Sequence, residues 1–230
     1  RYSAIRPSLM ETADLITAEE AERRVLILEN PSLKGETAAA DSLFAGLQLI
    51  MPGEVAGTHR HSPSALRFII EGDGAYTAIN GEKAPMKVGD LILTPSMVWH
   101  DHGNVGSDPV VWLDGLDIPL IRALGTMFTD LYNGGELHPE GRPDYDNIAR
   151  FGANMRPMNY QAEGSHSPVF HYPYDVSKRA LINLKKSKEF DPCHGIKLQY
   201  INPNTGEPVM ATIDCYLQLL PGGFSTQDYQ

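Results

Sequence analysis

The sequence has few cysteines, few basic residues and no long apolar runs. Cys193 and Cys215 are its only cysteines, and they form neither a CxxC motif nor the spacing of a disulfide framework. Lysine and arginine number 19 against 29 aspartate and glutamate, so the formal charge is −10. This negative excess repels phosphate backbones and anionic lipid surfaces. We therefore expect no nucleic-acid partner and no membrane partner.

No apolar run approaches the roughly 20 residues of a membrane span, and the first residues lack the basic-then-apolar order of a signal peptide. We therefore expect a cytoplasmic protein. The 230 residues are 42% hydrophobic and 21% charged, which is typical of a folded globular chain. The sequence begins without methionine and stops within a repeated pattern, so we expect a portion of a longer protein.

Short β-type runs, separated by glycine, proline and asparagine, occupy the chain from residue 43 to residue 116. This spacing indicates an antiparallel sandwich or barrel. Asn80-Gly81 predicts a two-residue type I′ hairpin, because both positions of that turn need a positive φ. The predicted strands of this region are 43–50, 66–71, 75–79, 91–94 and 110–116.

Three helices are expected outside these strands. Thr17-Ala18-Glu19-Glu20 has the pattern of a capping box and predicts a short helix through Arg24. Apolar spacing predicts two more helices, at 120–131 and 176–188. The polar stretch 133–171 is rich in proline and glycine and indicates an extended linker. The remaining predicted strands are 197–201 and 212–220.

A short internal repeat relates the first barrel region to the end of the chain. The residues from Leu47 to Gly53 recur from Leu217 to Gly222 with one residue deleted. Short matches also arise by chance, but here each copy opens a strand-to-turn transition, so we interpret them as a duplicated β unit.

Four of the eight histidines fall in two pairs, His59-Arg60-His61 and His100-Asp101-His102. Residues i and i+2 of a strand project to the same face, so His59 and His61 can bind one ion together. For an isolated pair of this kind, surface histidines near a turn are the simpler interpretation.

The sequence around these pairs resembles the two conserved motifs of the cupin superfamily. Residues 53–72, with His59 and His61, match the first motif, and residues 89–104, with His100, match the second in order and separation. The resemblance implies a small double-stranded β-helix barrel in which these three histidines bind a metal. It also implies a second cupin that is degenerate, because the repeat places an aspartate or a tyrosine where the first copy has His59.

The commonest cupin pattern has a glutamate shortly after the HxH pair, and residues 62–67 contain none. Three neutral imidazoles leave a divalent ion its full charge and, in octahedral geometry, three vacant positions, a variant of the two-His-one-carboxylate triad of ferrous oxygenases. Arg67 adds positive charge nearby. We therefore expect Fe(II) as the cofactor, with a substrate that chelates through two anionic oxygens and a vacancy for O2.

A more specific resemblance covers nearly the whole chain. Residues 65–68, 99–104 and 111–117 are similar to segments of gentisate 1,2-dioxygenases and their salicylate-cleaving relatives. The resemblance implies an Fe(II)-dependent bicupin that opens gentisate, 2,5-dihydroxybenzoate, between its carboxyl- and hydroxyl-bearing carbons to give maleylpyruvate. It also implies a homo-oligomer, a tetramer in that family.

Three other functions stay open. Salicylate or 1-hydroxy-2-naphthoate cleavage uses the same metal ligands, so the residues of the pocket wall must decide between the substrates. A metal- or sugar-binding cupin without catalysis keeps the barrel and does not need O2. A zinc hydrolase is disfavoured, because no general-base glutamate adjoins the histidines.

The expected architecture is dominated by β-structure, with short flanking helices and a second cupin that is truncated at the chain end. Its four parts are an N-terminal helical segment at 1–42, a metal-binding cupin barrel at 43–119, a helix and extended linker at 120–190, and the start of a degenerate second cupin at 191–230.

Two residues near the histidines are expected to contact the substrate directly. Arg67 suits a clamp on the substrate carboxylate, since its planar guanidinium can make two parallel hydrogen bonds. A surface ion pair is the alternative. His102 faces the same way as His100 and is expected to hydrogen-bond the bound phenolate or oxygen. Supporting a ligand, or acting as a fourth ligand, are its alternatives.

Five further residues complete the expected substrate site. Gln48 is expected to donate to a substrate oxygen, Gly46 to make room for the ring and Phe44 to pack on it, although Phe44 is equally suited to the core. Asp114 is expected to accept from a hydroxyl at ring position 5, with a structural ion pair to Arg67 as the alternative. Arg23 is expected to lean over the barrel mouth, or to be an ordinary exposed helical arginine.

Overall fold

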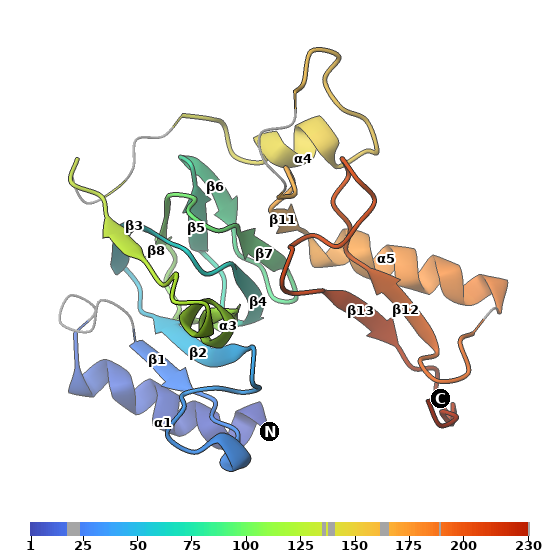
Figure 1. Ribbon diagram of the computed structural model, residues 1–230, viewed down its shortest axis with the longest axis horizontal. Helices are drawn as coiled ribbons and strands as arrows, with labels where there is room; N and C mark the ends of the chain where they lie inside the picture. Colours follow the sequence, from blue (N-terminus) through green and yellow to red (C-terminus); the bar gives the residue numbers. More distant parts are fainter. Residues whose placement is uncertain (18–23, 135–136, 138–140, 162–165, 189, 230) are drawn as a thin grey trace.

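The computed structural model describes residues 1–17, 24–134, 137, 141–161, 166–188 and 190–229. Figure 1 shows a barrel of strands beside a smaller part that holds two helices and a hairpin. The helices of the smaller part are α4 (Asp146–Phe151) and α5 (Tyr174–Leu184), and its hairpin pairs β12 (Ile196–Gln199) with β13 (Tyr216–Leu219). No helix in this part of the chain has the length and apolar character that crossing a bilayer requires.

Two antiparallel sheets form the barrel. The six-stranded sheet contains, in spatial order, β1 (Arg24–Ile27), β2 (Phe44–Ile50), β9 (Val110–Leu116), β4 (Ala65–Glu71), β7 (Leu91–Thr94) and β11 (His171–Tyr172). The five-stranded sheet contains β10 (Thr129–Leu131), β3 (Val55–His61), β8 (His100–Asn104), β5 (Ala75–Ile79) and β6 (Glu82–Pro85). The described residues also form the helices α1 (Tyr2–Leu15) and α3 (Ile118–Ala123) and the short 3-10 helices η1 (Pro31–Leu33) and η2 (Lys185–Ser187).

The apolar core lies between the two sheets. Ile69, Ile92 and Trp112 of the six-stranded sheet belong to the same buried cluster as Ile79 and Ala84 of the other sheet. Side chains alternate along a strand, and Leu47, Leu49 and Val111 on the opposite face of the six-stranded sheet form a second apolar cluster.

Helix α1 covers part of that outer face. Its Leu9 is fully buried and packs in one cluster with Leu47, Leu49 and Val111. The sequence reasoning did not anticipate this helix. It contains Pro7 and begins without a side-chain cap, so its local signals are weak and the contact with the sheet stabilises it.

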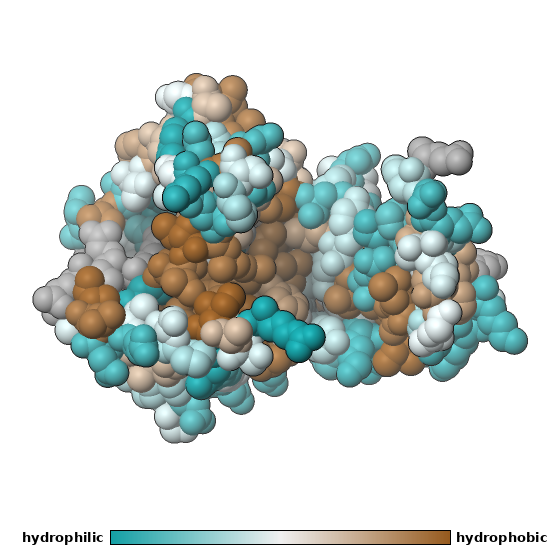
Figure 2. Space-filling model, turned by 90° about the horizontal axis from the view of Figure 1, so that it is seen from below, coloured by the Kyte–Doolittle hydropathy of each residue, from teal (hydrophilic) through white to brown (hydrophobic). Residues whose placement is uncertain are grey.

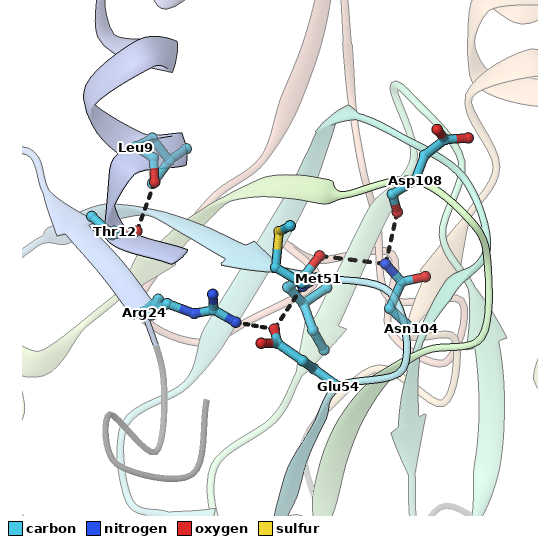
Figure 3. A network of polar contacts seen from close by, with 8 residues as sticks. Leu9, Thr12, Arg24, Met51, Glu54, Asn104 and Asp108 are labelled. Atoms are coloured by element: carbon cyan, nitrogen blue, oxygen red, sulfur yellow. Dashed lines mark hydrogen bonds and ion pairs between the residues drawn. The ribbon is translucent and has the colours of Figure 1, made fainter. Parts of the chain in front are cut away.

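A polar network joins the turns at one end of the barrel (Figure 3). Arg24 forms an ion pair with Glu54, and the same carboxylate accepts from the backbone N–H of Met51 at 2.6 Å. Asn104 donates to the carbonyl of Asp108 at 2.8 Å. These contacts fix β1 against the β2–β3 turn and hold the β8–β9 turn closed.

The strands predicted for residues 43–116 are confirmed, as is the hairpin between β5 and β6. Asn80 has a φ of 47° and Gly81 a φ of 81°, the two positive values that a type I′ turn requires. The helix predicted at 176–188 is found as α5 followed by η2. The returning strands are found as β12 and β13.

The helix predicted at 120–131 is confirmed only for residues 120–123 and is wrong beyond them. Helix α3 ends at Ala123, and Gly125 with a φ of 68° turns the chain away. Residues 129–131 then form β10, whose Thr129 and Leu131 pair with His61 and His59. The open edge of β3 offers backbone hydrogen bonds that override the helical spacing of these residues.

Two other predictions need correction or lie outside the described residues. The helix expected to run through Arg24 is wrong at that end, because Arg24 begins β1 and pairs with Leu49. Residues 18–23 of that segment, including Arg23, lie outside the described residues. The expected linker at 133–171 is not extended throughout, since it contains α4.

One face of the molecule carries a broad apolar surface on the barrel half (Figure 2). Exposed apolar side chains of the barrel include Phe68 on β4, which is 39% exposed, and Val88 between β6 and β7, which is 56% exposed. Apolar area of this kind is unusual on a monomer and is typical of a surface that another protein covers.

Candidate metal centre

Strands β3 and β8 bring three histidines together. His59 and His61 lie on β3, and His100 on β8 is directly opposite His59 in the strand pairing. One possible ligand atom from each residue lies within 4.8 Å of the other two. All three side chains are buried, and the ring centroid of His100 is 4.1 Å from that of His59 and 4.8 Å from that of His61. The structure therefore contains a three-histidine site that can hold a metal ion.

Each of the three imidazoles is oriented by a backbone carbonyl two residues away. A carbonyl only accepts hydrogen bonds, so the Nδ1 atom that contacts it must carry the proton. The other ring nitrogen, Nε2, then carries the lone pair that a metal ligand needs. The acceptors are Gly57 O at 2.9 Å for His59, Pro63 O at 2.7 Å for His61 and Val98 O at 2.9 Å for His100.

The surroundings keep His100 neutral. Burial is the main cause that holds the pKa of His100 well below its usual value, and the nearby His59, Arg67 and His61 lower this pKa further. A neutral imidazole is the form that binds a metal. Three imidazoles suit iron, zinc, copper or nickel.

Arg67 lies in a buried polar network rather than on the surface. Its side chain is 1% exposed, and its Nε is 3.4 Å from Oδ1 of Asp114, which faces it across the β4–β9 pairing. The same Asp114 oxygen accepts from Nε1 of Trp112 at 3.0 Å, while Nη1 of Arg67 donates to the Thr94 hydroxyl. Of the alternatives, the ion pair with Asp114 is the one that the structure shows, and it is buried.

His102 lies near the three histidines without joining their group of ligand atoms. Its side chain is buried, and its Nδ1 is 2.9 Å from Oγ1 of Thr77. Its ring centroid is 5.8 Å from that of His100 and 5.5 Å from Trp112. The convergent group found among the described residues contains His59, His61 and His100, and His102 is outside it.

Two of the expected substrate residues on β2, Gln48 and Gly46, pair with Trp112 and Asp114 of this buried network. Gln48 is buried opposite Trp112, and its Oε1 has no hydrogen-bond partner among the described residues. Gly46 faces Asp114 in the same pairing. A Cβ at Gly46 would lie 2.4 Å from Cγ1 of Val25 and 3.2 Å from the ring of Phe44, so these two side chains use the space beside the glycine.

Comparison with known proteins agrees with this geometry. A family model described as a cupin domain matches residues 46–116. Gentisate 1,2 dioxygenase 1 of Aquipseudomonas alcaligenes is 52% identical over 229 residues, which cover 100% of this chain and 66% of that protein. Gentisate 1,2-dioxygenase of Ralstonia sp is 40% identical over 96% of this chain and 61% of its own length.

A solved structure of salicylate 1,2-dioxygenase from Pseudoaminobacter salicylatoxidans, described as an adduct with gentisate, superposes with a TM-score of 0.85. Its sequence is 31% identical, and the match covers 94% of this chain and 61% of that one. The chain belongs to the gentisate 1,2-dioxygenase family. It spans a little under two thirds of the length of these relatives.

Two site residues of this family member escaped the sequence reasoning. Thr77 contacts His102, and Thr94 contacts Arg67. Both are threonines on the inner face of otherwise apolar strands, a position where a hydroxyl needs a partner. That signal is present in the sequence, although the identity of each partner depends on strand pairing.

Proposed function

We propose that this chain is the metal-binding part of an Fe(II)-dependent ring-cleaving dioxygenase that acts on gentisate. The reaction would use O2 to open the ring between the carboxyl- and hydroxyl-bearing carbons and give maleylpyruvate. One observation carries the proposal: three buried histidines, each with its Nδ1 held by a backbone carbonyl, place one ligand atom apiece within 4.8 Å of the others, with no carboxylate in the convergent group found among the described residues. Bound Fe(II) would supply a centre at which substrate oxygens and O2 meet.

The residues around this point fit the binding of an aromatic hydroxy acid. Arg67 carries a buried positive charge close enough to His100 to lower its pKa, and we assign it to the substrate carboxylate. Asp114 and Thr94 hold the guanidinium in place, so its orientation does not depend on substrate. Burial removes water from this charge and strengthens its interaction with an anion.

The polar groups on the neighbouring strands are assigned to the other substrate oxygens. We assign the buried amide of Gln48 to one of these oxygens, and the side chains of Phe44 and Val25 around Gly46 to the wall facing the ring. Asp114 contacts Trp112 and Arg67 through Oδ1, and we assign its carboxylate to a hydroxyl at ring position 5. His102 is assigned to the phenolate side of the substrate.

An activity screen tests the proposal. The 230-residue chain is reconstituted with Fe(II) without oxygen and then supplied with O2 and gentisate, salicylate or 1-hydroxy-2-naphthoate in separate reactions. We expect ring-fission product from gentisate at the highest kcat/KM, with one O2 consumed per product. Faster turnover of either other acid would select that alternative. No product from any acid, with iron bound, would favour a metal- or sugar-binding cupin without catalysis.

The same proposal covers the rest of the architecture. We propose that residues 1–42, 43–119, 120–190 and 191–230 are four structural parts, and that the β12–β13 hairpin begins a second, degenerate cupin. The exposed apolar surface of the barrel half supports a homo-oligomer, and we propose a tetramer. Light scattering of the purified chain tests this assembly. A cytoplasmic location stays a prediction.

A further inference from the structure

The four histidines of the site differ in what holds their Nδ1 atoms. Backbone carbonyls hold His59, His61 and His100, and a carbonyl can only accept. The Nδ1 atom of His102 instead contacts the hydroxyl of Thr77, at 2.9 Å. A hydroxyl can donate or accept, so it permits a different tautomer of the fourth ring.

The position of Thr77 decides which way this hydrogen bond runs. Thr77 lies on β5 directly opposite His102 on β8, and its side chain is 0% exposed. Its hydroxyl has no second hydrogen-bond partner among the described residues. If the hydroxyl accepted from Nδ1, its own proton would be buried without an acceptor, which is unfavourable. The favourable arrangement has Thr77 donating to Nδ1, so the proton of the neutral ring resides on Nε2.

We propose that Thr77 is a positioning residue that selects the Nε2–H tautomer of His102. In this tautomer His102 is a hydrogen-bond donor toward the barrel interior and is unsuited to bind a metal through Nε2. The tautomers therefore divide the four rings into three ligands and one donor. A donor at this place fits an anionic oxygen of a bound ligand, and this last step rests on the proposed function.

The geometry around His102 agrees with this division. Its ring centroid is 5.5 Å from that of Trp112, 5.8 Å from that of His100 and 6.5 Å from that of His59. It is close enough to the three ligands to contact a molecule bound there, while it stays outside the group whose ligand atoms converge. Because Nδ1 contacts Thr77, the Nε2 atom on the other side of the ring points away from Thr77.

Three variants separate the role of the hydroxyl from that of packing. Thr77→Val keeps the shape of the side chain and removes the donor, whereas Thr77→Ser keeps the donor. Thr58→Val is the matched control, since Thr58 is also a buried threonine whose hydroxyl bonds a β8 residue, Asp101, at 3.0 Å.

The first readout is the tautomer itself. Long-range 1H–15N NMR spectra of the Zn(II)-loaded, 15N-labelled chain report which nitrogen of each imidazole carries the proton, and a His102→Gln spectrum assigns the signals. We expect Nε2–H for His102 in the unsubstituted chain, in Thr77→Ser and in Thr58→Val, and a shift toward Nδ1–H in Thr77→Val. A proton on Nδ1 of His102 in the unsubstituted chain, or no change in Thr77→Val, would overturn the proposal.

The second readout is function. We expect Thr77→Val to lower kcat/KM for gentisate by at least about tenfold, with Zn(II) affinity unchanged and with recovery in Thr77→Ser. A loss of Zn(II) affinity in Thr77→Val would contradict the division into ligands and donor. If the unsubstituted chain turns over no acid while its tautomers are as expected, the proposed function fails and the role of Thr77 stands.

Discussion

The buried ion pair between Arg67 and Asp114 makes a strong prediction about stability. At the observed 3.4 Å and an effective dielectric constant of about 20, their Coulomb attraction is about 5 kcal/mol. Removing one partner leaves the other charge buried without its ion-pair partner. We expect Arg67→Met or Asp114→Asn alone to lower the free energy of unfolding by about 3 to 5 kcal/mol.

The two substitutions together should cost less than the sum of their separate effects, because no uncompensated charge remains. Urea unfolding followed by circular dichroism, analysed as a double-mutant cycle, measures the coupling. The ion pair between Arg60 and Asp130 is the matched control. It is shorter, at 2.8 Å, but its side chains are 34% and 32% exposed, so its coupling should stay below about 1 kcal/mol. Additivity of the Arg67 and Asp114 effects to within about 0.5 kcal/mol would refute the reasoning.

The same position tests recognition of the substrate carboxylate. We expect Arg67→Ala to lower kcat/KM by roughly 30- to 1000-fold, measured under conditions where the variant is folded and fully loaded with iron. Arg67→Lys keeps the charge and loses the planar fork. A large loss of kcat/KM in both variants indicates that the carboxylate is recognised through two parallel hydrogen bonds. A kcat/KM that is retained in Arg67→Lys alone indicates that the positive charge is sufficient. Unchanged kcat/KM in Arg67→Ala would place carboxylate binding elsewhere.

Three further predictions follow from the site, a buried thiol and a turn. His59→Ala should abolish binding of one divalent metal per chain by calorimetry, while the exposed His166→Ala retains it, and equal binding by both would remove the metal centre. Burial raises the pKa of Cys215 to about 11, so the alkylation rate of this thiol should rise about tenfold per pH unit up to that pH. A rate that levels off near pH 9, or a rate at pH 8 equal to that of the less buried Cys193, would contradict this prediction. Gly81→Ala should destabilise the chain by about 1 kcal/mol in urea unfolding, because its φ is 81°, and an unchanged midpoint would argue against the turn.

Local signals in the sequence were sufficient for five strands of the barrel, β2, β4, β5, β7 and β9, and for its tight hairpin. Alternating apolar residues specify a half-buried strand wherever it pairs, and Asn80-Gly81 specifies its turn through backbone conformation alone. The histidine pairs were readable for the same reason, since i and i+2 on one strand share a face. The missing glutamate after His61 was equally visible, and it already indicated a metal held by imidazole alone.

Local signals failed where the partner lies far away in the chain. Helix α1 has weak signals of its own and is stabilised by Leu47, Leu49 and Val111 on the outer face of the sheet. Residues 129–131 have helical spacing, but the open edge of β3 makes them a strand. In both places tertiary contact outweighs intrinsic propensity, because propensities differ by only about 1 kcal/mol per residue.

The sequence by itself therefore determined the kind of barrel and the residues that can hold a metal. Only the tertiary structure decided what each polar side chain does there. The pairing of β4 with β9 puts Arg67 beside Asp114, and the pairing of β5 with β8 puts Thr77 beside His102. The two strands of each pair are far apart in the sequence, and a shift of register by one residue would turn these side chains to opposite faces. The physical reason is that hydrogen-bond partners depend on register, which the whole fold sets.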